Sequence, residues 1–137
     1  MNRPSDSTAL ELPLPHHRHH TLGLVLLRRL ATHGLQDSRA TMLAFDAAGT
    51  RFRRLLVLAR ALVMDLTRTS RRRILLAPCC AAGMTRDEGL LIALVTGAGL
   101  DVHGVLTDDA HCPAAMTTAH ALGHELERIA IRNRWRR

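Results

Sequence analysis

Apolar residues recur along the chain with the spacing of an α-helix, most clearly over residues 51–69. At 100° per residue these positions fall on one wide arc, and arginines occupy the opposite side. An arc this wide is typical of a helix that neighbours cover on most of its surface, so we predict that 51–69 is the central helix of the fold. The arc comprises Phe52, Leu55, Leu56, Leu58, Ala59, Leu62, Val63 and Leu66, and the opposite side carries Arg53, Arg54, Arg60 and Arg68.

Residues that start and stop helices bound the other predicted helices. Asp37 is a suitable N-cap, and Gly34 and Gly49 suit helix ends because glycine tolerates positive φ. In the capping box at Thr85, the hydroxyl accepts one free backbone N–H and the carboxylate of Glu88 reaches back to another. A proline at the first helical position indicates one more helix start. We predict helices over 21–34, 37–49, 85–97 and 113–133.

These elements predict an all-α protein, a single compact bundle of about five helices. Residues 1–20 hold three prolines and no sustained hydrophobic period, so we expect a flexible N-terminal arm, a helical domain at 21–133 and a basic tail at 134–137. The short apolar runs 74–77 and 101–106 cannot be assigned from periodicity alone. If both were strands, the fold would be α+β with one small βαβ unit at 74–106. We favour the all-α fold because a two-stranded parallel sheet is poorly stabilised.

Composition narrows the class of protein further. The chain has 137 residues, 47% hydrophobic and 23% charged, which is too apolar for intrinsic disorder. No apolar run approaches the ~20 residues that cross a bilayer, so we expect no membrane span. Three cysteines without a recognisable secretory signal indicate a cytoplasmic, reducing compartment. We found no catalytic signature such as a nucleophile elbow or a phosphate-binding loop, which favours a non-enzymatic protein.

The most specific chemical feature is the adjacent pair Cys79 and Cys80, just before a predicted helix start. Cys112 occupies the N-cap of the last predicted helix, with His111 beside it. The backbone N–H groups at a helix start carry partial positive charge, which favours the thiolate form of a nearby cysteine. Three thiolates and one imidazole would be a suitable ligand set for tetrahedral zinc. However, adjacent cysteines rarely bind one ion together, and no C-x-x-C is present. We therefore expect no cofactor, with zinc at these four residues as the alternative.

A second candidate metal site lies on the last predicted helix. His120, His124 and Glu127 are spaced so that two imidazoles and a carboxylate project from one side. The arrangement is equally typical of boundary residues, and the zinc motif H-E-x-x-H is absent. The histidine-rich run at 16–20 would hold a metal only weakly, and we expect it to be solvated.

Arginine supplies all 19 basic residues, and they cluster. A basic surface could attract nucleic acid, but no aromatic stacking platform or helix-turn-helix pattern accompanies it. We therefore expect a protein partner or a homo-oligomer, and do not favour nucleic acid. The predicted basic surface comprises Arg53, Arg54, Arg60, Arg68, Arg71, Arg72 and Arg73.

Three segments together resemble a known family: 53–62, 70–80 with its P-C-C motif, and Met84-Thr85-Arg86-Asp87-Glu88. The chain is similar over about residues 22–127 to a small bacterial family catalogued only as a domain of unknown function. The resemblance implies a compact helical cytoplasmic protein and supplies no activity.

Three hypotheses about function follow from these residues. We favour a non-enzymatic regulatory or adaptor module that binds protein and self-associates. The first alternative is a thiol-based metal-binding or redox-sensing module that uses Cys79, Cys80 and Cys112. The second is nucleic-acid binding through the arginine-rich surface.

Overall fold

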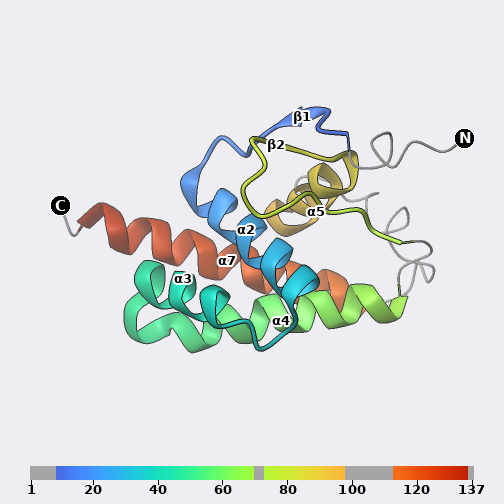
Figure 1. The fold of residues 1–137 in the computed structure, drawn as a ribbon. Coiled ribbons are helices and arrows are strands. Elements are labelled where there is room, and N and C mark those ends of the chain that lie inside the picture. The colour runs from blue at the N-terminus through green and yellow to red at the C-terminus, as the bar shows by residue number, and fades with distance from the viewer. Residues whose placement is uncertain (1–8, 70–72, 98–112, 136–137) are drawn as a thin grey trace, which may run out of the picture.

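The structure is a computed structural model that describes residues 9–69, 73–97 and 113–135, and it is all-α, as predicted. Figure 1 shows the helices packed around one another, with two very short strands above them. The elements in chain order are β1 (Leu12–Pro13), α2 (Arg18–His33), α3 (Ser38–Ala48), the 3₁₀ turn η1 (Gly49–Arg51), α4 (Phe52–Thr69), β2 (Gly83–Met84), α5 (Arg86–Thr96) and α7 (Pro113–Trp135).

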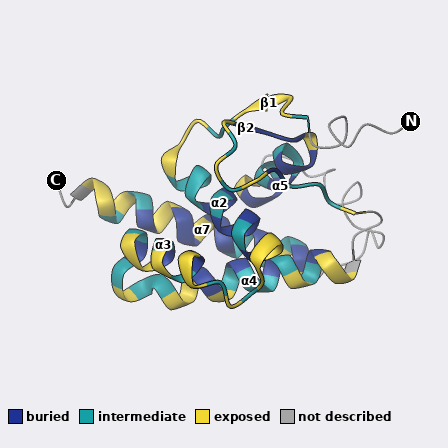
Figure 2. Ribbon diagram, in the orientation of Figure 1, coloured by how far each residue is buried: buried dark blue, intermediate teal, exposed yellow. Residues whose placement is uncertain are grey.

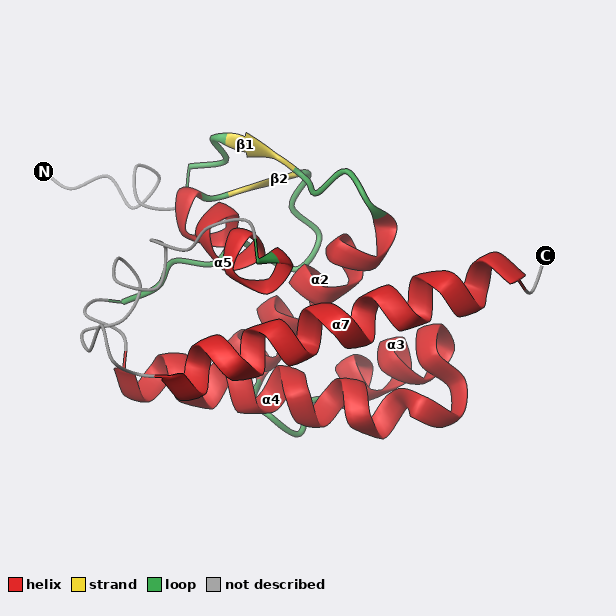
Figure 3. Ribbon diagram, turned by 180° about the vertical axis from the view of Figure 1, so that it is seen from behind, coloured by secondary structure: helices red, strands yellow, loops and turns green. Residues whose placement is uncertain are grey.

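The long helices α4 and α7 run side by side, and the other helices pack around them (Figures 1 and 3). The predicted apolar arc of α4 faces this core, where Leu55, Ala59 and Leu62 are fully buried. The inner face of α7 is buried in the same cluster, and it comprises Ala115, Ala119, Leu122, Leu126 and Ile129. Figure 2 shows the resulting pattern of buried inner faces and exposed outer faces. The prediction that 51–69 is a central helix is confirmed.

Cap residues bound the helices as the sequence predicted. The carboxylate of Asp37 accepts a hydrogen bond from the Ala40 amide, and the capping box of Thr85 and Glu88 is complete. Gly97 ends α5 in the left-handed region, at φ 75°, where glycine has no steric penalty. None of the helices in the described ranges is both long and apolar enough to cross a membrane.

The predicted start of the first helix at residue 21 is wrong by three residues. The helix begins at Arg18, and the carbonyl of His17 already accepts hydrogen bonds from the amides of His20 and Thr21. This polar first turn lies against α7, a contact between distant parts of the chain that hydrophobic periodicity cannot reveal. Helix α7 likewise continues to Trp135, two residues past the predicted end. The division into arm, domain and tail otherwise stays a prediction.

The small sheet differs from the alternative βαβ unit. Strand β1 pairs antiparallel with β2, Leu12 opposite Met84 and Pro13 opposite Gly83, and β1 lies within the residues that we expected to be the arm. Residues 74–77 form neither helix nor strand, and 101–106 lie outside the described residues. Irregular chain can pack against a core when other groups bind its backbone. Here the amide of Leu75 donates to the Asp87 carboxylate, and the amide of Ala77 donates to the Glu88 carboxylate.

A buried ion pair between α2 and α5 organises this region. Arg28 is 1% exposed and Glu88 is fully buried, and the guanidinium donates to both carboxylate oxygens, with Nη2 2.8 Å from Oε1. The same carboxylate accepts the amides of Ala77, at 3.1 Å, and Thr85, at 2.9 Å. Nη2 of Arg28 also donates to the carbonyl of Gly83 at 2.7 Å. The pair therefore satisfies backbone groups at several points along the segment that connects α4 to α5.

We expect Glu88→Gln to destabilise the protein by about 3–5 kcal/mol, because it leaves the buried Arg28 guanidinium without a countercharge. Urea unfolding followed by circular dichroism measures the change in the free energy of unfolding. Glu11→Gln is the matched control, since its carboxylate lies 3.5 Å from Arg86 in an exposed pair and should leave the midpoint nearly unchanged. Equal midpoints for the two variants would contradict the central role of the buried pair.

Candidate functional site

The two adjacent cysteines lie in a tight turn between α4 and α5. The amide of Ala81 donates to the carbonyl of Pro78 at 3.1 Å, which closes the turn, and we call residues 78–81 the thiol loop. The sulfur atoms of Cys79 and Cys80 are 3.3 Å apart. Cys79 is partly buried and Cys80 is exposed. The turn thus places both sulfurs within hydrogen-bonding distance of each other at the surface.

The Arg28–Glu88 pair fixes the thiol loop at both ends. Before the loop, the amide of Ala77 donates to the Glu88 carboxylate. At its last residue, Nη1 of Arg28 lies 3.4 Å from the carbonyl of Ala81, and after the loop Nη2 donates to the carbonyl of Gly83. Because the anchors are buried and charged, we expect the loop backbone to be held in one conformation.

A second arginine of α2 reaches the loop from the outside. Nη1 of Arg29 lies 3.6 Å from the sulfur of Cys79. The carboxylate of Asp37 orients this guanidinium, with distances of 2.7 Å to Nε and 3.3 Å to Nη2, while it also caps α3. The guanidinium is therefore positioned beside one sulfur of the pair.

These contacts separate the two thiols chemically. The pKa of Cys79 is lowered, chiefly because the Cys80 thiol donates a hydrogen bond to its thiolate; partial burial acts against this shift and Arg29 adds to it. The pKa of Cys80 is raised, because it keeps the proton that it shares with Cys79. A thiolate is the nucleophilic form of cysteine. These opposite shifts mean that Cys79 forms a thiolate more readily than Cys80 does.

The other two members of the predicted zinc set, Cys112 and His111, lie outside the described residues. Convergence of all three sulfurs therefore stays a prediction. Sequence analysis missed Arg28 and Arg29 as partners of this loop, although two consecutive arginines inside an otherwise apolar helix were a signal for a buried charge.

Glu127, a member of the predicted metal set on α7, contacts the first turn of α2. Its Oε1 lies 2.8 Å from Nε2 of His19 and 3.3 Å from Nε2 of His20. The pKa of Glu127 is lowered, chiefly by the hydrogen bond from His19; burial opposes this shift, and the charges of His19 and His20 add to it. We call His19, His20 and Glu127 the histidine cluster. Sequence analysis considered these residues in two separate sets, because their separation of more than 100 positions hides the contact.

The remaining members of that set, His120 and His124, line a neighbouring surface hollow of about 340 Å³ together with His20 and Glu127. Close helix packing forms one wall of this hollow. A Cβ atom at Gly123 would lie 2.1 Å from the backbone oxygen of Val95, so only glycine permits α7 to approach α5 this closely.

Two of the seven predicted basic-surface residues, Arg54 and Arg60, make polar contacts within the fold. Arg54, together with Arg51, pairs with the buried carboxylate of Glu125, and Nε of Arg60 donates to the carbonyl of Leu35 at 2.7 Å. Burial acts to raise the pKa of Glu125, but the two arginines outweigh it and hold the pKa below its ordinary value. Of the other predicted residues, Arg53 lies over the Phe52 ring, Arg68 and Arg73 are exposed, and Arg71 and Arg72 lie outside the described residues.

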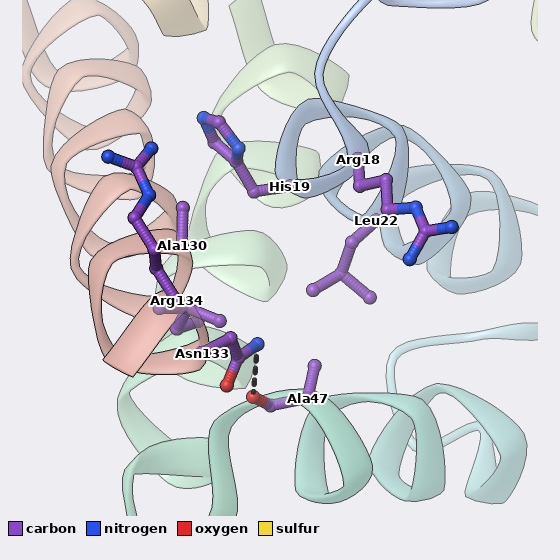
Figure 4. A pocket seen from close by; sticks show the side chains of 8 residues that line it. Arg18, His19, Leu22, Ala47, Ala130, Asn133 and Arg134 are labelled. Carbon is purple, nitrogen blue, oxygen red and sulfur yellow. Dashed lines mark hydrogen bonds between the residues drawn. The ribbon is translucent and has the colours of Figure 1, made fainter. Parts of the chain in front are cut away.

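A further hollow, of about 470 Å³, lies between α2, α3 and the end of α7. Figure 4 shows Leu22 and Ala47 facing it, with Arg18 and Arg134 on opposite sides and Asn133 hydrogen-bonded to the carbonyl of Ala47. Its lining is largely apolar with a cationic rim. The lining includes none of the described thiols, so we place the candidate covalent chemistry at the thiol loop.

The helical packing and the thiol loop define a small all-α protein with a paired thiol beside a capped helix start. The chain belongs to DUF6628, a family of unknown function, which matches residues 1–137. The resemblance to such a family is thereby confirmed. No curated protein and no solved structure matches the chain.

We expect Gly123→Ala to destabilise the protein by about 1–3 kcal/mol, because the added methyl meets a backbone carbonyl that cannot rotate away. Alanine is otherwise the better helix former by about 1 kcal/mol. Gly23→Ala is the matched control, since its methyl would meet only the Leu126 side-chain tip, which can move. Thermal unfolding compares the variants, and equal or greater loss for Gly23→Ala would contradict this account of the crossing.

Proposed function

We propose that this protein is a non-enzymatic regulatory module that senses thiol oxidants through Cys79. The observation that carries the proposal is the 3.3 Å separation of two sulfurs, one of which also lies beside the guanidinium of Arg29. A sensor cysteine needs thiolate character and access to solvent. Cys79 has the lowered pKa, and the turn lies at the surface.

The proposed reaction is thiol–disulfide exchange with a low-molecular-weight disulfide. The Cys79 thiolate attacks one sulfur of the disulfide, the old S–S bond breaks, and the departing thiolate accepts the proton that Cys80 held. The products are a mixed disulfide at Cys79, one free small thiol and a Cys80 thiolate, which regains its proton from water. No other oxidant is needed, because the small disulfide is itself reduced.

The mixed disulfide should persist because Cys80 is poorly placed to displace it. Adjacent Cα atoms across a trans peptide are about 3.8 Å apart, whereas disulfides usually need 4.4–6.8 Å. An intrapair disulfide would therefore be strained and easily reduced. Cys80 acts as the proton donor, and an external thiol resets the sensor.

The first test follows thiol reactivity against pH in a Cys112→Ser chain, which keeps only the two loop thiols. We expect the fast-reacting thiol to be Cys79, so Cys79→Ser removes the fast phase. Arg29→Gln should raise the pKa of Cys79 and slow its reaction with an aromatic disulfide at pH 7 by about two- to fivefold. At high pH Cys79 is a thiolate with or without Arg29, so the two rates should converge. Stopped-flow absorbance measures the rates.

Arg53→Gln is the matched control, because it removes an exposed arginine on α4 that has no contact with the loop. It should leave the pH profile of the fast phase unchanged. Mass spectrometry of the mixed disulfide should locate it on Cys79. A modification found on Cys80, or two thiols with the same ordinary pH profile, would refute the proposal.

A specific observation also favours the self-associating adaptor role. Several large apolar side chains are exposed on the outer surface of α3 and α4, and Phe45 of α3 contacts Phe52 of α4 with ring centroids 5.3 Å apart. Exposed aromatic clusters of this kind often mark protein-binding surfaces. We take a second copy of the chain as the partner to test. The exposed residues are Met42, Phe45, Val57 and Met64.

For this role we expect the wild type to be larger than one chain by light scattering and Phe45→Ser to be monomeric, because the substitution removes the exposed ring. Leu10→Ser is the control, since it replaces an exposed apolar residue outside this surface. A wild-type protein that is strictly monomeric at both low and high salt would rule out the self-associating form.

The zinc set that includes Cys112 and His111, nucleic-acid binding, and a cytoplasmic, reducing location remain proposals of lower rank. Anaerobic metal analysis of the untagged protein tests the thiol-bound zinc, because structural zinc sites retain their ion tightly. Binding to duplex or single strands that weakens steeply with salt would support the nucleic-acid alternative.

A further inference from the structure

Metal-ligating side chains from two distant parts of the chain meet where the first turn of α2 lies against α7. One ring nitrogen each of His19 and His20 and a carboxylate oxygen of Glu127 all lie within 4.8 Å of one another. Consecutive residues of a helix usually project about 100° apart. Here both imidazoles nevertheless approach the same carboxylate oxygen, with ring centroids 4.2 Å apart.

We propose that the histidine cluster binds a divalent transition-metal ion, with zinc as the test ion. Imidazole nitrogen and carboxylate oxygen are ligands that zinc accepts, with bond lengths of about 2.0–2.2 Å. In a tetrahedral site such bonds place neighbouring ligand atoms roughly 3.3 Å apart. The observed separations of 2.8 and 3.3 Å from Glu127 are close to this value, so small side-chain movements would admit the ion.

The surroundings provide a source for the fourth ligand. His120 and His124 line the same hollow as His20 and Glu127, so α7 presents two more imidazoles on that side. Glu127 is 55% exposed, which leaves a path for the ion from solvent, whereas His19 and His20 are each 14% exposed.

The ion would connect α2 to α7 directly. Its ligands would come from positions 19–20 and 127, so binding would restrict the separation of two helices that are distant in sequence. Any ligand that binds only the folded state raises the stability of that state. Zinc should therefore raise the melting temperature of the protein as well as bind to it.

The test uses the full, untagged chain after removal of metal with a chelator, and measures zinc affinity by competition with a chromophoric chelator. We expect saturable binding of one equivalent at this site, weakened about tenfold or more by Glu127→Gln and by His19→Ala, with the zinc-dependent rise in melting temperature lost in both. His120→Ala and His124→Ala identify the fourth ligand. His33→Ala, an exposed histidine at the other end of α2, is the matched control and should change nothing.

The same measurements on a chain with all three cysteines replaced by serine separate this site from the thiols. Binding should persist there, and the cobalt form should show visible bands without the near-ultraviolet charge transfer of a thiolate ligand. Circular dichroism without metal checks that each variant is folded. The proposal would be overturned by absence of saturable binding, by wild-type affinity in Glu127→Gln and His19→Ala, or by loss of binding in the cysteine-free chain.

Discussion

The buried ion pair of Arg28 and Glu88 is the constraint on which the rest of the structure depends. It connects the middle of α2 to the first turn of α5, where the carboxylate also completes the helix cap. Fifteen positions separate Thr69 from Thr85, and the described part of this connection, from residue 73, contains no helix before α5. A connection without helix still needs partners for its backbone groups. Arg28 and Glu88 supply them at Ala77, Ala81 and Gly83.

This role explains why an apolar replacement could not substitute for the pair. Many buried ion pairs can be replaced by well-packed apolar side chains at little cost, because only the two charges lose their partners. Here the replacement would also leave the amides of Ala77 and Thr85 and the carbonyl of Gly83 without partners. A buried backbone group without a hydrogen bond costs about 1–3 kcal/mol. The pair is thus required by the path of the chain, and this path in turn positions Cys79 and Cys80.

Local signals in the sequence were sufficient to predict the helices and the fold class. Periodicity identified α4, and the cap residues Asp37 and Thr85 defined helix starts, because each acts on atoms within four positions in the chain. The same reasoning predicted the exposed and buried faces of α4. It singled out Cys79 and Cys80 because thiols near a helix start have a known electrostatic consequence.

The contacts that make the sites are not local, and for that reason the sequence did not reveal them. Arg28 lies 60 positions from Glu88, and His19 lies 108 positions from Glu127. Helical periodicity assigns a residue to a face but does not say which helix that face meets. The sequence therefore assigned no role to Arg28, and it indicated Glu88 only as part of a capping box. The early start of α2 was missed for the same reason, since Glu127 binds its polar first turn.

Both candidate sites use α2, which raises the question of whether they influence each other. His19 and Arg29 are ten residues apart, about 15 Å along the helix axis. Between them Leu24, Leu26 and Leu27 are buried in the core, so this part of α2 is closely packed. Coupling between distant sites requires an element with two alternative arrangements. The packed helix between these sites has only one arrangement. A metal ion at the N-terminus of α2 and a mixed disulfide beside Arg29 should therefore form independently of each other.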